Sequence, residues 1–134
     1  MSLQEELLGF AGSVGDMFRR RVAETPDGLA FLDPDRAPEG PNTWTKYTWA
    51  ESRVLVDRLA AGLLARGLAR EQRVGIISTT RLEWILLDLA VACAAGATTT
   101  VYPNTAAGDV EFILEDSGTC VAVVEDAAQL AKVE

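Results

Sequence analysis

The residues best suited to chemistry in this sequence stand in one polar stretch, Ser78-Thr79-Thr80-Arg81. The stretch lies between an apolar run typical of a strand and a helical pattern, where amides, hydroxyls and a guanidinium can converge on an anion. It also suits helix capping, because Thr80 and Glu83 have the spacing of a capping box. We favour capping as the simpler interpretation, and an anion site stays the alternative.

Two pairs of carboxylates, Glu115-Asp116 and Glu125-Asp126, are groups that acid/base chemistry or magnesium binding would use. Adjacent residues of a helix point in different directions, so we expect both pairs to face solvent. We place Asp33 and Asp35 in a proline-containing loop, where two carboxylates do not complete a calcium site and a role in a turn is the simpler interpretation.

The residue types give little support for catalysis by cysteine or histidine. The 134 residues include no histidine, which excludes a Ser-His-acid triad. Cys93 and Cys120 are far apart in apolar segments, and we expect two small buried side chains rather than a disulfide, a metal site or a nucleophile. A glycine-rich phosphate loop with its lysine is also missing. We therefore assign no catalytic, cofactor-binding or metal-binding residue to this chain.

The charge balance is acidic, with a formal net charge of −8. This balance opposes binding to nucleic acid, and we expect the one dense basic cluster, Arg19-Arg20-Arg21, to be a solvated helix face. No basic region followed by an apolar run resembles a signal peptide. The longest apolar run, Trp84 to Ala97, contains Asp88 and is too short to cross a bilayer. We expect a cytoplasmic protein.

The elements that would position these groups alternate between strand and helix. Between Arg73 and Asp126 the pattern predicts strands at 74–77, 97–102 and 120–124, with a helix opened by Thr80 and another at 109–116. Gly96 is expected to close the first of these helices, and Asp126 to cap one more helix that has barely begun at Glu134. This order is typical of a parallel α/β sheet.

The preceding residues predict a helix over 13–24, a hairpin of strands at 28–33 and 44–48, and a second helix. A capping box of Thr48 and Glu51 opens this second helix, Gly67 ends it, and its expected buried stripe is Val56, Leu59, Ala60 and Leu63. We expect the amino-terminal part of an open, mainly parallel sheet with helices on both faces, in an incomplete domain. Residues 1–12 would be a tail, 13–47 the helix and hairpin, and 48–134 the strand-helix units.

Several segments resemble the start of the adenylate-forming (AMP-binding) enzymes, in order and in spacing. They are TKYTWAE (45–51), LAAGL (59–63) with Gly67, RVGIIS (73–78), RLEW (81–84), AGA (95–97), VYPNT (101–105) and FILEDSG (112–118). The YPNT segment is most similar to long-chain fatty acyl-CoA synthetases. The resemblance covers about residues 13–134.

The resemblance implies a parent enzyme that uses ATP and magnesium to convert a fatty acid to an acyl-adenylate, and then transfers the acyl group to coenzyme A. Beyond Glu134 would lie the family's phosphate loop, its adenine and ribose contacts and its catalytic lysine. We therefore expect no cofactor in this fragment, and we expect the chain alone to be an inactive scaffold. Its partners would be the remainder of the parent chain or, through an uncovered sheet edge, a second copy. The parent would be cytoplasmic or peripheral to a membrane.

Two other interpretations remain open. A stand-alone flavodoxin-like binding module would have the same alternation of strands and helices. However, a receiver-type module would place acidic residues at the ends of its strands, whereas the first two central strands end at Ser78 and Tyr102. A non-catalytic adaptor derived from the ligase family would instead use the open sheet edge to bind another chain.

Overall fold

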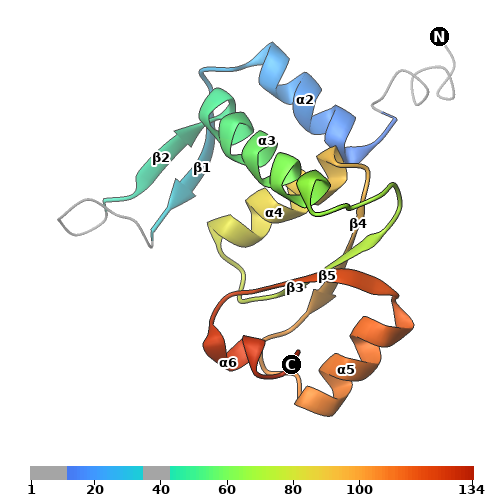
Figure 1. Cartoon of the computed structure of the whole chain (residues 1–134). Coiled ribbons are helices and arrows are strands. Elements are labelled where there is room, and N and C mark those ends of the chain that lie inside the picture. Colours follow the sequence, from blue (N-terminus) through green and yellow to red (C-terminus); the bar gives the residue numbers. More distant parts are fainter. Residues whose placement is uncertain (1–11, 35–42) are drawn as a thin grey trace, which may run out of the picture.

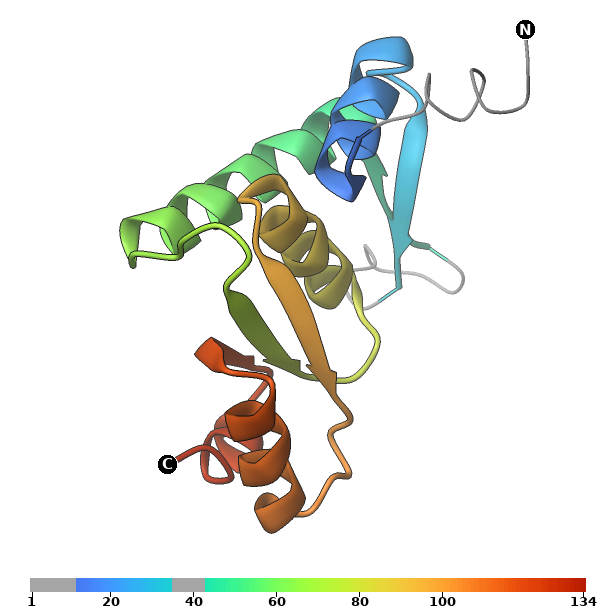
Figure 2. The same ribbon diagram turned by 90° about the vertical axis from the view of Figure 1, so that its right-hand side faces the viewer.

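A three-stranded parallel sheet forms the centre of the computed structural model, which describes residues 12–34 and 43–134. Its strand order is β4-β3-β5, with β3 at Arg73–Ile77, β4 at Ala97–Val101 and β5 at Thr119–Val124. Helix α4 (Leu82–Cys93) joins β3 to β4, and α5 (Ala107–Asp116) joins β4 to β5. Figure 2 shows α4 and α5 on opposite faces of the sheet, so the predicted parallel α/β class is confirmed.

The amino-terminal elements build a separate layer beyond α4 (Figure 1). They are α2 (Val14–Glu24), the antiparallel strands β1 (Leu29–Asp33) and β2 (Thr45–Thr48), and α3 (Trp49–Ala65). The predicted capping box opens α3, since Glu51 N–H donates to Thr48 Oγ1 over 3.2 Å and Thr48 N–H donates to the Glu51 carboxylate over 2.8 Å. The predicted helix and hairpin are therefore confirmed.

Two apolar cores lie on the two faces of the sheet, because side chains of a strand alternate between its faces. Val74 and Ile76 join the larger core with α2, α3 and α4. Ile77 joins the smaller core with Val101 and with Val110 of α5. Strand β3 is buried from Val74 to Ile77, as expected for a parallel strand covered on both faces.

Glycine permits close packing where α5 approaches β3 and where the chain enters β4. A Cβ at Gly75 would lie 2.8 Å from Leu114 Cδ2 of α5, and one at Gly96 would lie 3.2 Å from the Gln72 carbonyl oxygen. Gly96 lies at the end of α4, as predicted, and its N–H donates to the Val91 carbonyl oxygen at 2.9 Å, while the positive φ of 60° belongs to Ala95. Gly67, with φ 89°, takes its predicted place after α3.

Three local expectations differ from the structure. Helix α4 begins at Leu82 after an Arg81 cap residue that makes no side-chain capping bond, so the proposed Thr80 capping box is wrong. Leu59 is 38% exposed, because the buried stripe of α3 runs through Ser52, Val56, Ala60 and Leu63. Asp33 ends β1 and is 2% exposed, rather than standing in the loop. Asp35 and residues 1–11 of the expected tail lie outside the described residues.

Candidate functional site

The carboxyl ends of the three parallel strands lie at one edge of the sheet, where Ser78, Tyr102 and Glu125 follow β3, β4 and β5. Strands β3 and β5 are neighbours, yet the chain leaves them toward opposite faces. After β3 it enters α4, whereas after β5 it enters α6 (Ala127–Leu130), and Val133 then packs against the α5-side core. Such a reversal between neighbouring strands is the position at which open α/β sheets bind ligands. This edge is therefore the candidate site.

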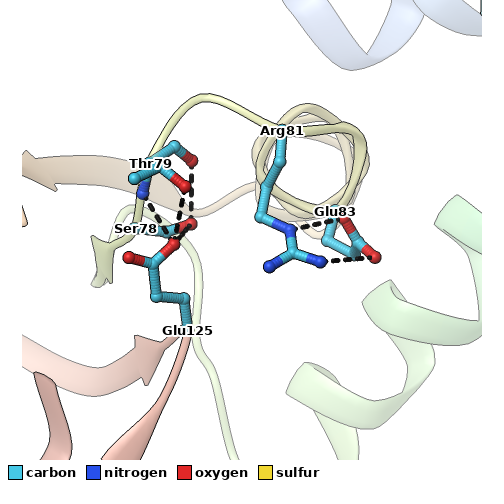
Figure 3. A network of polar contacts seen from close by, with 5 residues as sticks. All are labelled: Ser78, Thr79, Arg81, Glu83 and Glu125. Carbon is cyan, nitrogen blue, oxygen red and sulfur yellow. Dashed lines mark hydrogen bonds and ion pairs between the residues drawn. The ribbon is translucent and has the colours of Figure 1, made fainter. Parts of the chain in front are cut away.

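A carboxylate from β5 occupies the turn after β3 (Figure 3). Glu125 Oε2 accepts three hydrogen bonds, from Thr79 N–H at 2.9 Å, from Thr79 Oγ1 at 2.7 Å and from Ser78 Oγ at 3.1 Å. The hydrogen bonds from the Thr79 side chain and backbone lower the pKa of Glu125, and the positive charge of Arg81 adds a smaller effect in the same direction. Glu125 is therefore an anion that the protein itself supplies to this turn.

The occupied turn decides between the two interpretations of the 78–81 stretch. Helix capping by Thr80 does not occur, and the hydroxyls of Ser78 and Thr79 bind Glu125. A phosphate group at this turn would have to displace a carboxylate and lie against its negative charge. The residues present therefore do not fit the phosphates of ATP, which the family resemblance implies for the parent.

A small cavity of about 220 Å³ opens beside this turn. The Arg81 guanidinium pairs with the Glu83 carboxylate at 2.8 and 3.2 Å at its mouth, and both side chains are partly exposed (Figure 3). Its lining residues are Ile76, Ser78, Arg81, Glu83, Trp84, Leu87, Val123, Val124 and Glu125. The walls are mainly apolar, and the lining includes no cysteine, histidine or lysine that would act as a nucleophile or a general base.

A second set of bonds ties the loop after β4 to the carboxyl-terminal segment. Lys132 Nζ donates to the carbonyl oxygens of Pro103 at 2.6 Å and Thr105 at 2.9 Å, and Gln129 Nε2 donates to that of Pro103 at 3.1 Å. Side chains from or beyond the end of β5 therefore hold the loops that follow both other strands. Local sequence patterns do not predict the roles of Lys132 and Gln129 or the bonds of Glu125, because their partners are 26 to 47 residues away in the chain.

The remaining candidate carboxylates lie in different environments. Glu115 and Asp116 are exposed, as expected. Asp126 caps α6, as predicted, and accepts a bond from Gln129 N–H at 2.9 Å. Glu125 is partly exposed, but it follows β5 rather than lying in a helix, and it binds the turn after β3.

Both cysteines are free thiols. Cys93 is half-buried on α4, and burial raises the pKa of its thiol. Cys120 is exposed on β5, so the expectation that it is buried is wrong; it occupies the outer strand of the sheet.

The arginine cluster lies on the exposed side of α2, as expected. Arg20 pairs with Asp16 at 3.0 Å and Arg21 with Glu24 at 3.8 Å, while Arg19 donates to the Cys93 carbonyl oxygen at 3.0 Å. All three guanidinium groups thus have partners within the chain.

Within residues 12–34 and 43–134, no three acidic, histidine or cysteine side chains come together as a possible metal site. Within the same ranges, every helix is too short or too polar to span a bilayer.

A family model described as AMP-binding enzyme matches residues 18–134. The chain belongs to the AMP-binding enzyme family. It is 35% identical over 118 residues to the long-chain-fatty-acid–CoA ligase FadD15 of Mycobacterium bovis, which covers 88% of this chain and 19% of that protein. It is 32% identical over 115 residues to the long-chain-fatty-acid–CoA ligase heimdall of Drosophila melanogaster, which covers 86% of this chain and 17% of that protein.

Solved structures show the same architecture. The Mycobacterium tuberculosis fatty acyl CoA synthetase superposes with a TM-score of 0.79 at 26% identity, over 90% of this chain and 22% of that chain. The chain thus spans about a fifth of the length of these relatives.

Proposed function

We propose that this chain is the amino-terminal portion of a long-chain fatty acid–CoA ligase. The parent enzyme would activate a fatty acid with ATP and magnesium to an acyl-adenylate and transfer the acyl group to coenzyme A. The observation that supports this most strongly is the 35% identity to FadD15 over 88% of the chain. The similar fold of a fatty acyl CoA synthetase, at a TM-score of 0.79, is consistent with it.

Within that enzyme the chain would act as a scaffold. Glu125 fills the turn after β3, which has hydroxyls and an arginine, so phosphate groups would be held by residues outside these 134. The two apolar cores and the bonds of Glu125 and Lys132 would instead hold one edge of the sheet rigid beside the rest of the enzyme. We expect no acyl-CoA formation by the isolated chain, and a cytoplasmic or membrane-peripheral parent.

A chimeric enzyme tests this proposal. The segment of FadD15 that matches this chain is replaced by the corresponding residues of this chain, and formation of palmitoyl-CoA is followed with ATP and coenzyme A. We expect an active chimera and no activity from the 134-residue chain by itself. A folded, monodisperse chimera without activity, next to active FadD15, would contradict the proposed function. Palmitoyl-CoA formation by the isolated chain would contradict the scaffold role.

The adaptor interpretation has one observation in its favour, the open edge of β5. On this interpretation, and also for an isolated ligase fragment, the chain would self-associate through that edge. Light scattering at increasing concentration tests the association, and a monodisperse monomer at high concentration would exclude it.

A further inference from the structure

One short segment holds both of the other loops at the carboxyl edge of the sheet. We call it the β5–α6 clamp, and it comprises residues 125–132 (Figure 1). Its first residue, Glu125, binds the turn after β3 through Ser78 and Thr79. Its last residue, Lys132, donates to carbonyl oxygens of the loop after β4. The clamp thus contacts the turn with an anion at one end and the loop with a cation at the other.

A single helical turn connects the two ends of the clamp. Helix α6 is only four residues long, and Asp126 caps it by accepting a hydrogen bond from Gln129 N–H at 2.9 Å. The neighbouring Glu125 N–H donates to the Ile77 carbonyl oxygen at 3.1 Å, which fixes the first end to β3. Lys132 N–H donates to the Gln129 carbonyl oxygen at 3.1 Å and so continues the turn to the second end. Because so short a helix is not stable by itself, its position depends on the contacts at its two ends.

The side chain of Gln129 shows that the position of α6 has a cost. The residue is 7% exposed, and its Nε2 donates to the Pro103 carbonyl oxygen at 3.1 Å. Its Oε1 is also buried, yet it accepts no hydrogen bond from any residue in the ranges 12–34 and 43–134. A buried acceptor without a donor costs free energy, which a shift of α6 toward solvent would recover. The bonds at the two ends of the clamp therefore hold α6 against a second position.

We propose that the β5–α6 clamp opens as one unit and thereby couples the turn after β3 to the loop after β4. Loss of the Glu125 bonds frees α6 to move, and Gln129 and Lys132 then leave the loop. Loss of the Lys132 bonds has the reverse effect and releases the turn at Ser78 and Thr79. Coupling between two sites is reciprocal, so a ligand or partner that fixed one of these segments would also fix the other. The coupling involves only contacts within this chain and does not depend on the proposed ligase function.

Amide hydrogen exchange, followed by NMR at neutral pH, measures the two segments separately. Thr79 N–H donates to Glu125 and reports on the turn, while Thr105 N–H donates to the Tyr102 carbonyl oxygen at 3.0 Å and reports on the loop. We expect E125Q to accelerate exchange at Thr105, and K132M to accelerate exchange at Thr79, each by about fivefold or more. K132R should retain slow exchange at Thr79, because arginine can still donate to two carbonyl oxygens. Acceleration by each substitution only at the segment that it contacts would overturn the proposal.

Two comparisons separate opening of the clamp from general destabilisation. T48A removes a cap in the amino-terminal layer, and it should change exchange at Thr79 and Thr105 by less than about twofold. Equal acceleration in T48A would show that both amides exchange through global unfolding, which would overturn the proposal. In the double variant E125Q/K132M, exchange at Thr105 should match that in K132M, because E125Q acts on the loop only through the clamp. A further acceleration by E125Q in the K132M background would show that the clamp is not the connection.

Discussion

Replacing Gly75 by alanine should destabilise the protein, although the residue lies in a strand and has an ordinary backbone conformation. The added Cβ would lie 2.8 Å from Leu114 Cδ2 and 3.1 Å from Thr119 Cγ2. The first distance is roughly 1 Å short of the optimal separation of about 3.5–4.0 Å between carbon atoms. Overpacking of this kind costs about 1–3 kcal/mol. Alanine also lowers the conformational entropy of the unfolded chain, which offsets about 0.4–1 kcal/mol of this destabilisation.

We therefore expect G75A to lower the free energy of unfolding by about 1–2 kcal/mol, measured by urea unfolding with tryptophan fluorescence. The matched control is G108A, because a Cβ at Gly108 on the exposed start of α5 meets nothing within 4 Å. That substitution should stabilise the protein by about 0.5 kcal/mol, since glycine is the weaker helix former. The same chemical change should thus have opposite signs at the two positions.

A double-mutant cycle identifies the cause of the effect. L114A removes the methyl group that the new Cβ would meet, so its cost should be smaller in the G75A background than in the wild type. Additive effects of G75A and L114A would show that close packing of α5 on β3 is not the reason for glycine at this position. A stability of G75A equal to that of G108A would refute the reasoning altogether.

Three further predictions concern the caps and the ionisable groups. T48A removes the side-chain acceptor that opens α3 and should cost about 1 kcal/mol in thermal unfolding, whereas T48S should retain most of the stability. E125Q should destabilise the protein at neutral pH. Folding lowers the pKa of Glu125, so its ionised carboxylate contributes fully to the stability of the protein above the ordinary glutamate pKa. This contribution is lost as the pH falls through the lower pKa of the folded state. The urea midpoints of E125Q and wild type should therefore converge on acidification. Cys120 should react with a thiol reagent before Cys93, because Cys120 is exposed and burial raises the pKa of Cys93; the reverse order, compared in C93S and C120S, would contradict this.

Patterns of neighbouring residues predicted the elements of this fold well. The capping box of Thr48 and Glu51, the left-handed Gly67 and the Asp126 cap all depend on residues within one turn, and the structure contains each of them. The same local reasoning failed at Thr80, because Glu83 binds Arg81 and a carboxylate from another strand binds Thr79. Local spacing cannot exclude a partner that is distant in the chain.

The candidate site was therefore less predictable than the fold around it. Both the 78–81 stretch and Glu125 stand out in the sequence, but no local pattern connects them, because 46 residues separate Thr79 from Glu125. Only the pairing of β3 with β5 brings the two together. Periodicity also could not show that Cys120 is exposed, because exposure there depends on whether another strand covers the edge of β5.

The role of Glu125 argues for a division of labour within the proposed ligase. A turn that holds a substrate phosphate needs unpaired donors, whereas the donors of Ser78 and Thr79 are bound to a carboxylate that is ionised at neutral pH. Lys132 likewise uses its ammonium group on two carbonyl oxygens. Lys132 and the hydroxyls of Ser78 and Thr79 thus hold separate segments of this edge together. A binding site is more accurately built on loops whose positions are already determined. On our proposal the chain would contribute a rigid wall, and the groups that contact ATP would belong to other parts of the enzyme.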